Sequence, residues 1–422
     1  MTLLAIILRS IVDVLAYPAT MLLFWVVMAI VYYRYRRLAA LERQWTARSP
    51  SPLTRTMQSL GEGVVGGVAA SLLFVLLGPS IDRMGLGFLL PAALALAMLD
   101  ARFVCFSYAA GLACICNLLL GWPALDVASA ASVVGVLHLI EAGLIWATGH
   151  RGAIPVLVSG LDGRPAGAFL MERFWPVPAA IGLMLYYPIS SVLPDVIAMP
   201  QWWPLIKSTA PVPEGMQAVY ALVGLTAILG YSDLTYTRLP RRKTGVTAAM
   251  SAAYSLILLG LAVLSSTRRW ALWAAALFSP AGHELMVCLL RMAEMDGRPV
   301  FQVPACGSGV MVADVDPRSP AWEVGVRRGD VIEAVNCRPV SSTDEMLGAM
   351  NVSPIAIVMD VRSALPGRPA HVRTVQIRGA RAGLGLHLVP QAGDYPDVRL
   401  ARTGRVSLLI RCLKARLGRR RK

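Results

Sequence analysis

The chain has 422 residues, 56% of them hydrophobic, and its 40 Lys and Arg against 25 Asp and Glu give a formal net charge of +15. This apolar content is high for a soluble protein of such length and favours a membrane protein. Seven cysteines without paired-ligand spacing indicate free thiols in a reducing compartment. No recognition fold or aromatic platform accompanies the basic charge, so we expect no nucleic-acid partner.

The first three quarters of the chain contain apolar segments near the length that crosses a bilayer, about 20 residues. They predict eight or nine transmembrane helices, at roughly residues 12–33, 62–79, 85–100, 103–121, 127–148, 176–193, 216–232, 246–265 and 270–290. Residues 1–8 fit an interfacial helix and lack the features of a cleaved signal peptide. The predicted fold class is a membrane all-α helical bundle followed by a C-terminal α+β domain.

Lys and Arg concentrate in two loops, one with six Arg between residues 34 and 55 and one at residues 238–243. Because basic loops stay in the cytoplasm, both loops are expected there. Alternation from them places the loop 149–175 and everything after residue 290 in the cytoplasm as well. Arg268 and Arg269 fall outside in this arrangement, but the larger loops outweigh them. We therefore predict a multi-pass protein of the cell membrane with a cytoplasmic C-terminal domain.

The loop at residues 149–175 carries structure of its own. Two apolar runs, 154–158 and 166–170, flank Asp162-Gly163, a dipeptide typical of β-hairpin turns. The segment Arg173-Phe-Trp-Pro176 follows and provides an aromatic anchor where the next span begins. We expect a cytoplasmic β-hairpin joined to a helix that starts near residue 176.

Four polar residues lie inside predicted spans, where such residues are costly and often functional. His138 and Glu141 are three apart and share a helix face, and His283 and Glu284 lie in the last span. The second pair is similar to the start of the H-E-x-x-H motif of site-2 intramembrane metalloproteases, but Val287 replaces the second histidine ligand. We therefore expect interhelical hydrogen bonds, no catalytic residue, no metal ligand and no cofactor. A degenerate or active metalloprotease is the alternative.

The C-terminal part alternates strand and helix signals. Apolar runs at 310–315, 331–335, 355–361, 372–377 and 384–389 predict strands. Ser319 precedes Pro320 as a helix cap, and Ser342 and Glu345 are spaced as a capping box. The pattern V-x-P-x-S-P-A…G-D-V-I-x-x-V-N-x-x-P-V across residues 315–340 resembles bacterial PDZ domains. Cys337 stands where glycine is usual in that pattern.

That resemblance implies peptide binding by strand addition, with backbone N–H groups receiving a carboxylate. The loop Gly383-Leu384-Gly385-Leu386 has the form of the carboxylate-binding loop, although an ordinary closing strand is the alternative. The implied groove also includes Met346, Leu347 and Met350 of the helix at 342–350. The predicted domains are 1–292 in the membrane, 293–395 as the PDZ domain and 396–422 as a basic tail.

A second resemblance covers nearly the whole chain. In order, the landmarks are His138-Leu-Ile-Glu141, Gly149-His150, Arg173-Phe-Trp-Pro176, His283-Glu284 and Leu384-Gly385…Pro390. This order resembles the MinJ-type topological determinants of cell division in Gram-positive bacteria. The resemblance implies a non-enzymatic membrane scaffold at poles and septa. Its implied partners are the curvature-sensing protein DivIVA and the Min division inhibitor. It does not indicate an oligomeric state.

Overall fold

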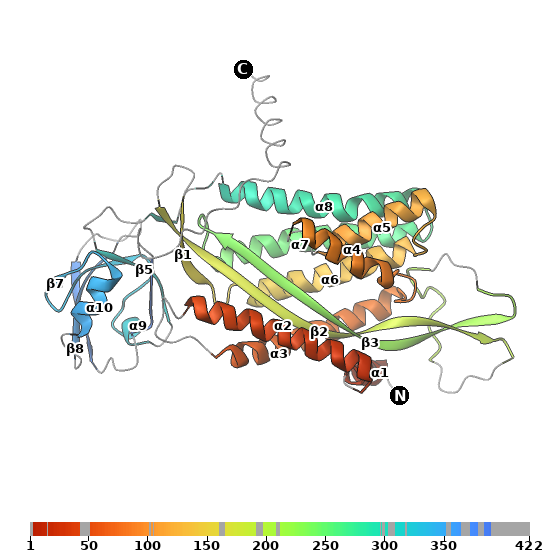
Figure 1. The fold of residues 1–422 in the computed structure, drawn as a ribbon, viewed down its shortest axis with the longest axis horizontal. Coiled ribbons are helices and arrows are strands. Elements are labelled where there is room, and N and C mark those ends of the chain that lie inside the picture. Colours follow the sequence, from red (N-terminus) through yellow and green to blue (C-terminus); the bar gives the residue numbers. More distant parts are fainter. Residues whose placement is uncertain are drawn as a thin grey trace, which may run out of the picture.

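Figure 1 presents the computed structural model of the protein, in which a small α+β domain lies at one end of a helical bundle. The structure describes residues 3–14, 16–42, 51–100, 103, 105–159, 165–190, 197–207, 212–295, 297, 300–302, 309–316, 319–351, 356–363, 372–378 and 384–389. The predicted turn Asp162-Gly163, the loop residue Gly383 and the basic tail at 396–422 lie outside these residues.

The helices of the bundle follow most of the predicted apolar segments. They are α1 (Leu3–Asp13), α2 (Pro18–Glu42), α3 (Pro52–Leu77), α4 (Leu86–Leu99), α5 (Phe106–Leu120), α6 (Val127–Thr148), α7 (Pro240–Ser265) and α8 (Arg269–Met295). Among the described residues, α3, α6, α7 and α8 are long and apolar enough to cross a membrane, whereas α4 and α5 are shorter. The predicted count of eight or nine helical spans is therefore not confirmed.

Two of the predicted helical spans are wrong. Residues 176–193 and 216–232 fall largely in two long strands, β2 (Pro165–Pro188) and β3 (Met216–Thr235). These strands pair antiparallel from Phe169↔Thr235 to Pro188↔Met216. β1 (Ile154–Ser159) pairs with the beginning of β2, as the predicted hairpin requires. The membrane part of the chain therefore combines helices with a β-hairpin and is not an all-α bundle.

The hairpin is longer than a bilayer is thick. A strand of 20 residues such as β3 extends about 65 Å at about 3.3 Å per residue, against about 30 Å for the hydrocarbon core. Figure 1 shows β2 and β3 running along the helices and projecting beyond them at the end away from the C-terminal domain.

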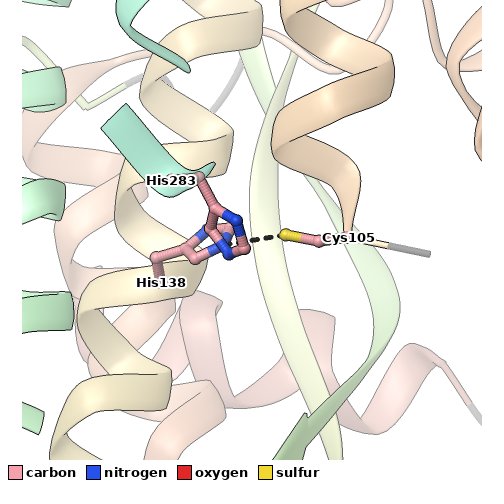
Figure 2. A group of neighbouring side chains, drawn as sticks. All are labelled: Cys105, His138 and His283. Atoms are coloured by element: carbon pink, nitrogen blue, oxygen red, sulfur yellow. Dashed lines mark hydrogen bonds between the residues drawn. The ribbon is translucent and has the colours of Figure 1, made fainter. Parts of the chain in front are cut away.

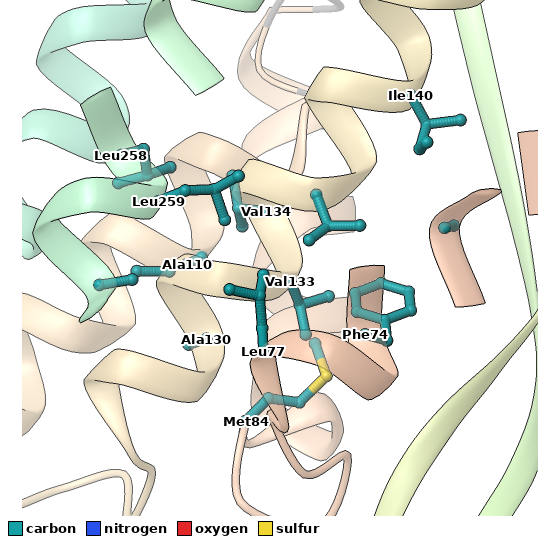
Figure 3. Close-up of a cluster of buried hydrophobic side chains, with 14 of the residues drawn as sticks. Phe74, Leu77, Met84, Ala110, Ala130, Val133, Val134, Ile140, Leu258 and Leu259 are labelled. Carbon is teal, nitrogen blue, oxygen red and sulfur yellow. The ribbon is translucent and has the colours of Figure 1, made fainter. Parts of the chain in front are cut away.

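The side chains of β2 alternate as a strand requires, and one set enters the helical core. Trp175, Val177, Ala179 and Ile181 have no exposed surface and belong to the same cluster as residues of α3, α5, α6, α7 and α8. Figure 3 shows the part of this cluster in which Phe74 of α3, Val133 of α6 and Leu258 of α7 converge. Burial of this face holds the hairpin against the bundle.

On the edge of β2 opposite β3, β1 is the one strand partner within the described part of the chain, and α3 covers the rest of this edge. A bare strand edge is not tolerated in lipid because its N–H and C=O groups lack hydrogen-bond partners. The Ser71 hydroxyl accepts from the Ala180 N–H at 2.8 Å, and the Ser59 hydroxyl donates to the Phe174 carbonyl. Just beyond α3, the Ser80 hydroxyl accepts from the Met184 N–H at 2.9 Å.

Prolines and glycines complete this contact. Pro176 and Pro178 lack an N–H, so neither places an unsatisfied donor on the covered edge. Their carbonyl oxygens lie so close to α3 that a Cβ on Gly63 or Gly67 would be 1.9 Å from Pro176 O or Pro178 O, respectively. Residues 59, 63, 67 and 71 are four apart and therefore share one face of α3. This Ser-Gly-Gly-Ser face is shaped to receive a strand edge.

Two basic residues that suggested the membrane orientation are buried in ion pairs. Arg173 of β2 is 5% exposed and pairs with Glu62 of α3. Lys243 of α7 is 2% exposed, and its Nζ lies 3.2 Å from Asp233 Oδ2 and 3.4 Å from Glu294 Oε2. Because these charges have structural partners, they contribute less to the positive-inside signal than the number of Lys and Arg residues in the loops implies.

The C-terminal domain has the predicted order of elements. After β4 (Phe301–Gln302), which pairs with β2, come β5 (Val310–Val315), α9 (Pro320–Glu323), β6 (Asp330–Val335), β7 (Arg338–Pro339), α10 (Thr343–Asn351), β8 (Ala356–Ser363), β9 (Val372–Arg378) and β10 (Leu386–Leu388). The sheet order is β10-β5-β6-β8-β9, with β7 paired to β6. The last strand of the domain therefore lies beside the first, at the edge of the sheet.

Local details of this domain agree with the sequence. The Ser319 hydroxyl accepts from the Trp322 N–H at 3.3 Å at the start of α9. Cys337 adopts a φ of 62°, which explains why glycine is favoured at this position. The Ser342 hydroxyl accepts from the Glu345 N–H at 3.1 Å, but the Glu345 carboxylate reaches Ser341 instead of completing the box on Ser342. Hydrogen bonds from the Ser341 hydroxyl and N–H hold the pKa of Glu345 below its usual value.

The C-terminal domain docks on the end of the bundle that carries the β1–β2 hairpin. Ala313 of β5 and Val389 just after β10 are buried against Phe169 of β2, with Ala153 and Leu239 around them. The opposite face of β5, with Val310, Val312 and Val315, forms the domain's own core. The contact therefore fixes the domain without using the helix α10.

Candidate functional site: an edge strand and helix in the C-terminal domain

One face of α10 is available for a ligand. Thr343, Leu347 and Met350 are spaced i, i+4 and i+7 and form one stripe. Leu347 is 49% exposed and Met350 is partly buried. Met346, which the sequence also suggested for the groove, is 3% exposed and packs in the domain core. It stabilises the helix and offers no surface to a peptide.

The strand β10 provides the second wall. It pairs antiparallel with β5, with Leu386 opposite Val315 and Leu388 opposite Val312. Leu386 and Leu388 pack against the same core as Met350, so α10 and the edge strand border that core together. β10 ends the strand order of the sheet. Its outer edge is therefore in the position from which strand addition proceeds.

The loop before β10 turns its carbonyl groups inward. The Leu384 carbonyl accepts from the Ala321 N–H at 3.2 Å, and the Gly385 carbonyl accepts from the Asp316 N–H at 2.8 Å. In a trans peptide unit the N–H points opposite to the C=O. The N–H groups of Gly385 and Leu386 therefore point away from α9 and β5, which is the arrangement a carboxylate-binding nest requires.

Gly385 has a structural requirement as well. Its φ of +69° favours glycine, and an added Cβ would lie 2.3 Å from the Ser319 Cβ. A bulky residue at Gly385 would disturb the start of α9 whether or not the loop binds a ligand. Exposed Leu347 is therefore the better position at which to test the groove.

The four polar residues predicted inside the membrane lie on two helices that face each other. His138 and Glu141 are one turn apart on α6, and His283 and Glu284 lie on α8. The two imidazole rings lie edge to face with centroids 5.4 Å apart. Helix packing thus brings the His residues together although 145 positions separate them in the sequence (283 minus 138).

Two further residues join this cluster that sequence reasoning missed. The Cys105 Sγ, just before α5, lies 3.0 Å from His138 Nε2. The Tyr108 hydroxyl donates to Glu284 Oε2 at 2.7 Å and lies 3.2 Å from His283 Nδ1. Neither residue has a motif around it. Both lie within the predicted span 103–121, and no local pattern distinguishes them from the other residues of that span.

Comparisons with known proteins bear on the C-terminal domain and on the chain as a whole. The PDZ domain family matches residues 311–353, from β5 through α10. The chain is 24% identical over 232 residues to the cell division topological determinant MinJ of Bacillus subtilis, covering 54% of this chain and 52% of that protein. It is 27% identical over 272 residues to a probable MinJ of Lacticaseibacillus paracasei, covering 63% of this chain and 66% of the relative.

The chain thus spans about half of the first relative and slightly less than two thirds of the second. These matches confirm the two resemblances predicted from the sequence. They match residues 311–353 of the C-terminal domain to the PDZ domain family, and they relate more than half of the chain to proteins named for cell-division topology.

Proposed function

We propose that this MinJ-type, PDZ-containing chain is a non-enzymatic membrane scaffold that recruits cytoplasmic partners to the site of cell division. The names of its relatives refer to cell-division topology. A PDZ domain serves protein interaction. The bundle supplies the membrane anchor through its long apolar helices. This role needs no chemistry at the PDZ domain.

The observation that carries the proposal is the edge strand β10 beside the exposed face of α10. A partner's extended segment would pair with the outer edge of β10 and place a side chain against Leu347 and Met350. The outward N–H groups of Gly385 and Leu386 would receive its terminal carboxylate. Such binding uses the partner's main chain for affinity and its side chains for specificity.

Orientation and partners complete the proposal. The C-terminal domain lies at the end of the bundle where α2 ends, α3 begins and β3 leads into α7, which is the end with the basic loops. The exposed basic charges there favour contact with anionic lipid, at about 1 kcal/mol each. We therefore place the PDZ domain in the cytoplasm, with division proteins of the DivIVA and Min type as partners.

Substitution of Leu347 by Asp should weaken peptide binding by tenfold or more, because a carboxylate would face the apolar segment of the ligand and be desolvated. The probe is a library of random peptides with free C-termini, selected against the full chain in detergent micelles. Val372→Asp is the matched control, since Val372 is 51% exposed on β9, at the opposite sheet edge. Equal affinity of both variants for the selected peptides would refute the groove.

Deletion of the C-terminal domain provides a coarser test, and the structure determines where to cut. A truncation after Arg291 would remove Glu294, whose Oε1 accepts from the Thr235 hydroxyl and the Tyr236 N–H, each at 2.7 Å. Buried Lys243 would also lose one partner. Deletion of residues 309–422 keeps α8 and β4 and should abolish recruitment while the bundle remains folded. Recruitment by the truncated chain would assign binding to the membrane loops instead.

A further inference from the structure

Three side chains from separate elements converge inside the helical bundle. Cys105 precedes α5, His138 lies in the middle of α6, and His283 lies on α8. Their Sγ and ring nitrogen atoms all lie within 4.8 Å of one another. Figure 2 shows the two imidazole rings side by side with the Cys105 sulfur directed at them. His138 is 6% exposed, and Cys105 and His283 are partly buried.

The hydrogen bond of His138 fixes which of its nitrogens is free. Its Nδ1 lies 2.8 Å from the Val134 carbonyl oxygen. A carbonyl oxygen can only accept, so Nδ1 carries a proton, and in the neutral ring the lone pair is on Nε2. That lone pair faces the Cys105 sulfur at 3.0 Å. Metal-binding histidines use this same arrangement, in which a backbone carbonyl orients the ring through its other nitrogen.

His283 is oriented in a similar way by a two-step chain. The Tyr108 hydroxyl gives its proton to Glu284 Oε2 at 2.7 Å. It therefore accepts from His283 Nδ1, which lies 3.2 Å away. The Nε2 atom of His283 is then the nitrogen with the lone pair. Glu284 thus acts on His283 through Tyr108, as carboxylates do behind the histidine ligands of zinc.

We propose that Cys105, His138 and His283 bind a zinc ion that fastens α5, α6 and α8 together within the bundle. One thiolate and two imidazole nitrogens form a nitrogen–sulfur donor set of the kind that Zn²⁺ prefers, whereas Mg²⁺ and Ca²⁺ require oxygen ligands. Zinc bonds of about 2.3 Å to sulfur and about 2.05 Å to nitrogen give a tetrahedral S···N distance of about 3.5 Å. The present S···N distance of 3.0 Å therefore needs to lengthen by only about 0.5 Å.

The surroundings favour the ion in two further respects. Three protein ligands leave one tetrahedral position for water. Cation binding would also balance the charge of a Cys105 thiolate, which is costly in an apolar bundle without a partner. The site lies outside the PDZ domain, so this inference and the proposed recruiting function fail independently.

The test is metal analysis of the full chain purified in detergent without chelators. Wild type should contain about one zinc per chain, and Cys105→Ser and His283→Ala should each lower this content tenfold or more. Cys114→Ser is the matched control, because Cys114 is buried on the adjacent α5 and lies outside the three-residue cluster. Undiminished zinc in both cluster variants, or no zinc in wild type, would overturn the proposal.

A spectroscopic measurement covers the case in which the variants do not fold. Wild-type protein stripped of metal and loaded with Co²⁺ should develop a thiolate-to-cobalt charge-transfer absorption, because Cys105 supplies the sulfur ligand. The Cys114→Ser protein should develop the same absorption. Absence of this absorption in folded wild-type protein would exclude a thiolate-bound metal and leave a hydrogen-bonded cluster only.

Discussion

Replacement of Gly67 by alanine should destabilise the membrane part by about 3 kcal/mol or more, because overpacking against backbone leaves no side chain that can move aside. The new Cβ would lie 1.9 Å from the Pro178 carbonyl oxygen. In an isolated helix the same change would be favourable by about 1 kcal/mol. The sign of the effect thus reports the contact with β2. Thermal unfolding in detergent micelles measures it.

Gly61 provides the control on the same helix. A Cβ added at Gly61 would have no atom within 4 Å. Gly61→Ala should therefore leave the melting temperature unchanged or raise it, as helix propensity alone predicts. If Gly67→Ala behaved like Gly61→Ala, the hairpin would not lie against α3, and the account of β2 as a covered edge strand would be wrong.

Loss of the Glu62 carboxylate should have a comparable effect. Its oxygens accept from the Trp175 indole at 2.8 Å, the Thr148 hydroxyl at 3.0 Å and the guanidinium of buried Arg173. Glu62→Ala leaves the Arg173 charge buried without its partner, and breaking such a pair costs about 3–5 kcal/mol. Thermal unfolding and the yield of folded protein in detergent both report the loss.

Arg151→Ala is the control for this network. Its guanidinium lies 3.3 Å from Glu62 Oε1, but its side chain is 60% exposed. Exposed ion pairs contribute about 0–1 kcal/mol, so this variant should melt close to wild type. A Glu62 variant as stable as the Arg151 variant would contradict the assignment of Glu62 as the carboxylate that joins α3 to β2 and α6.

The C-terminal domain could be predicted from sequence because its signals are local. Ser319 with Pro320 and the Ser342 cap each determine where a short helix begins, and their order matches the PDZ pattern. The position of β10 could not be derived in this way, because pairing of the last strand with β5 depends on closure of the whole sheet. The resemblance implied only that the glycine loop and the helix at 342–350 form one groove, and the structure adds the pairing of β10 with β5.

The membrane part was predicted less well, and the reason is physical. Apolar content indicates that a segment is buried but not whether it is helix or strand. Residues 216–232 are long and apolar enough to be predicted as a helical span, although they form β3. The distinguishing signals lay elsewhere. Pro176 and Pro178 occupy alternate positions, which suits an edge strand. The face of α3 that covers this strand consists of small residues four positions apart, Ser59, Gly63, Gly67 and Ser71. These signals are informative only when both partners are considered together.

The polar cluster illustrates the same limit. Because Val287 replaces the second histidine of the protease motif, local reasoning predicted no metal ligand. The structure instead brings His138 from another helix beside His283 and adds Cys105. A ligand set assembled from three elements has no spacing that a sequence pattern can detect, whereas ligands on one helix do.

In the proposed function, the PDZ groove recruits cytoplasmic division proteins to the membrane. The most direct measurement is proximity labelling in living cells, with the labelling enzyme fused to the C-terminus of wild type, Leu347→Asp and Val372→Asp. Wild type and Val372→Asp should label the same cytoplasmic division proteins, and Leu347→Asp should lose them while remaining in the membrane. Unchanged labelling by Leu347→Asp, or labelling of extracytoplasmic proteins only, would contradict recruitment through this groove.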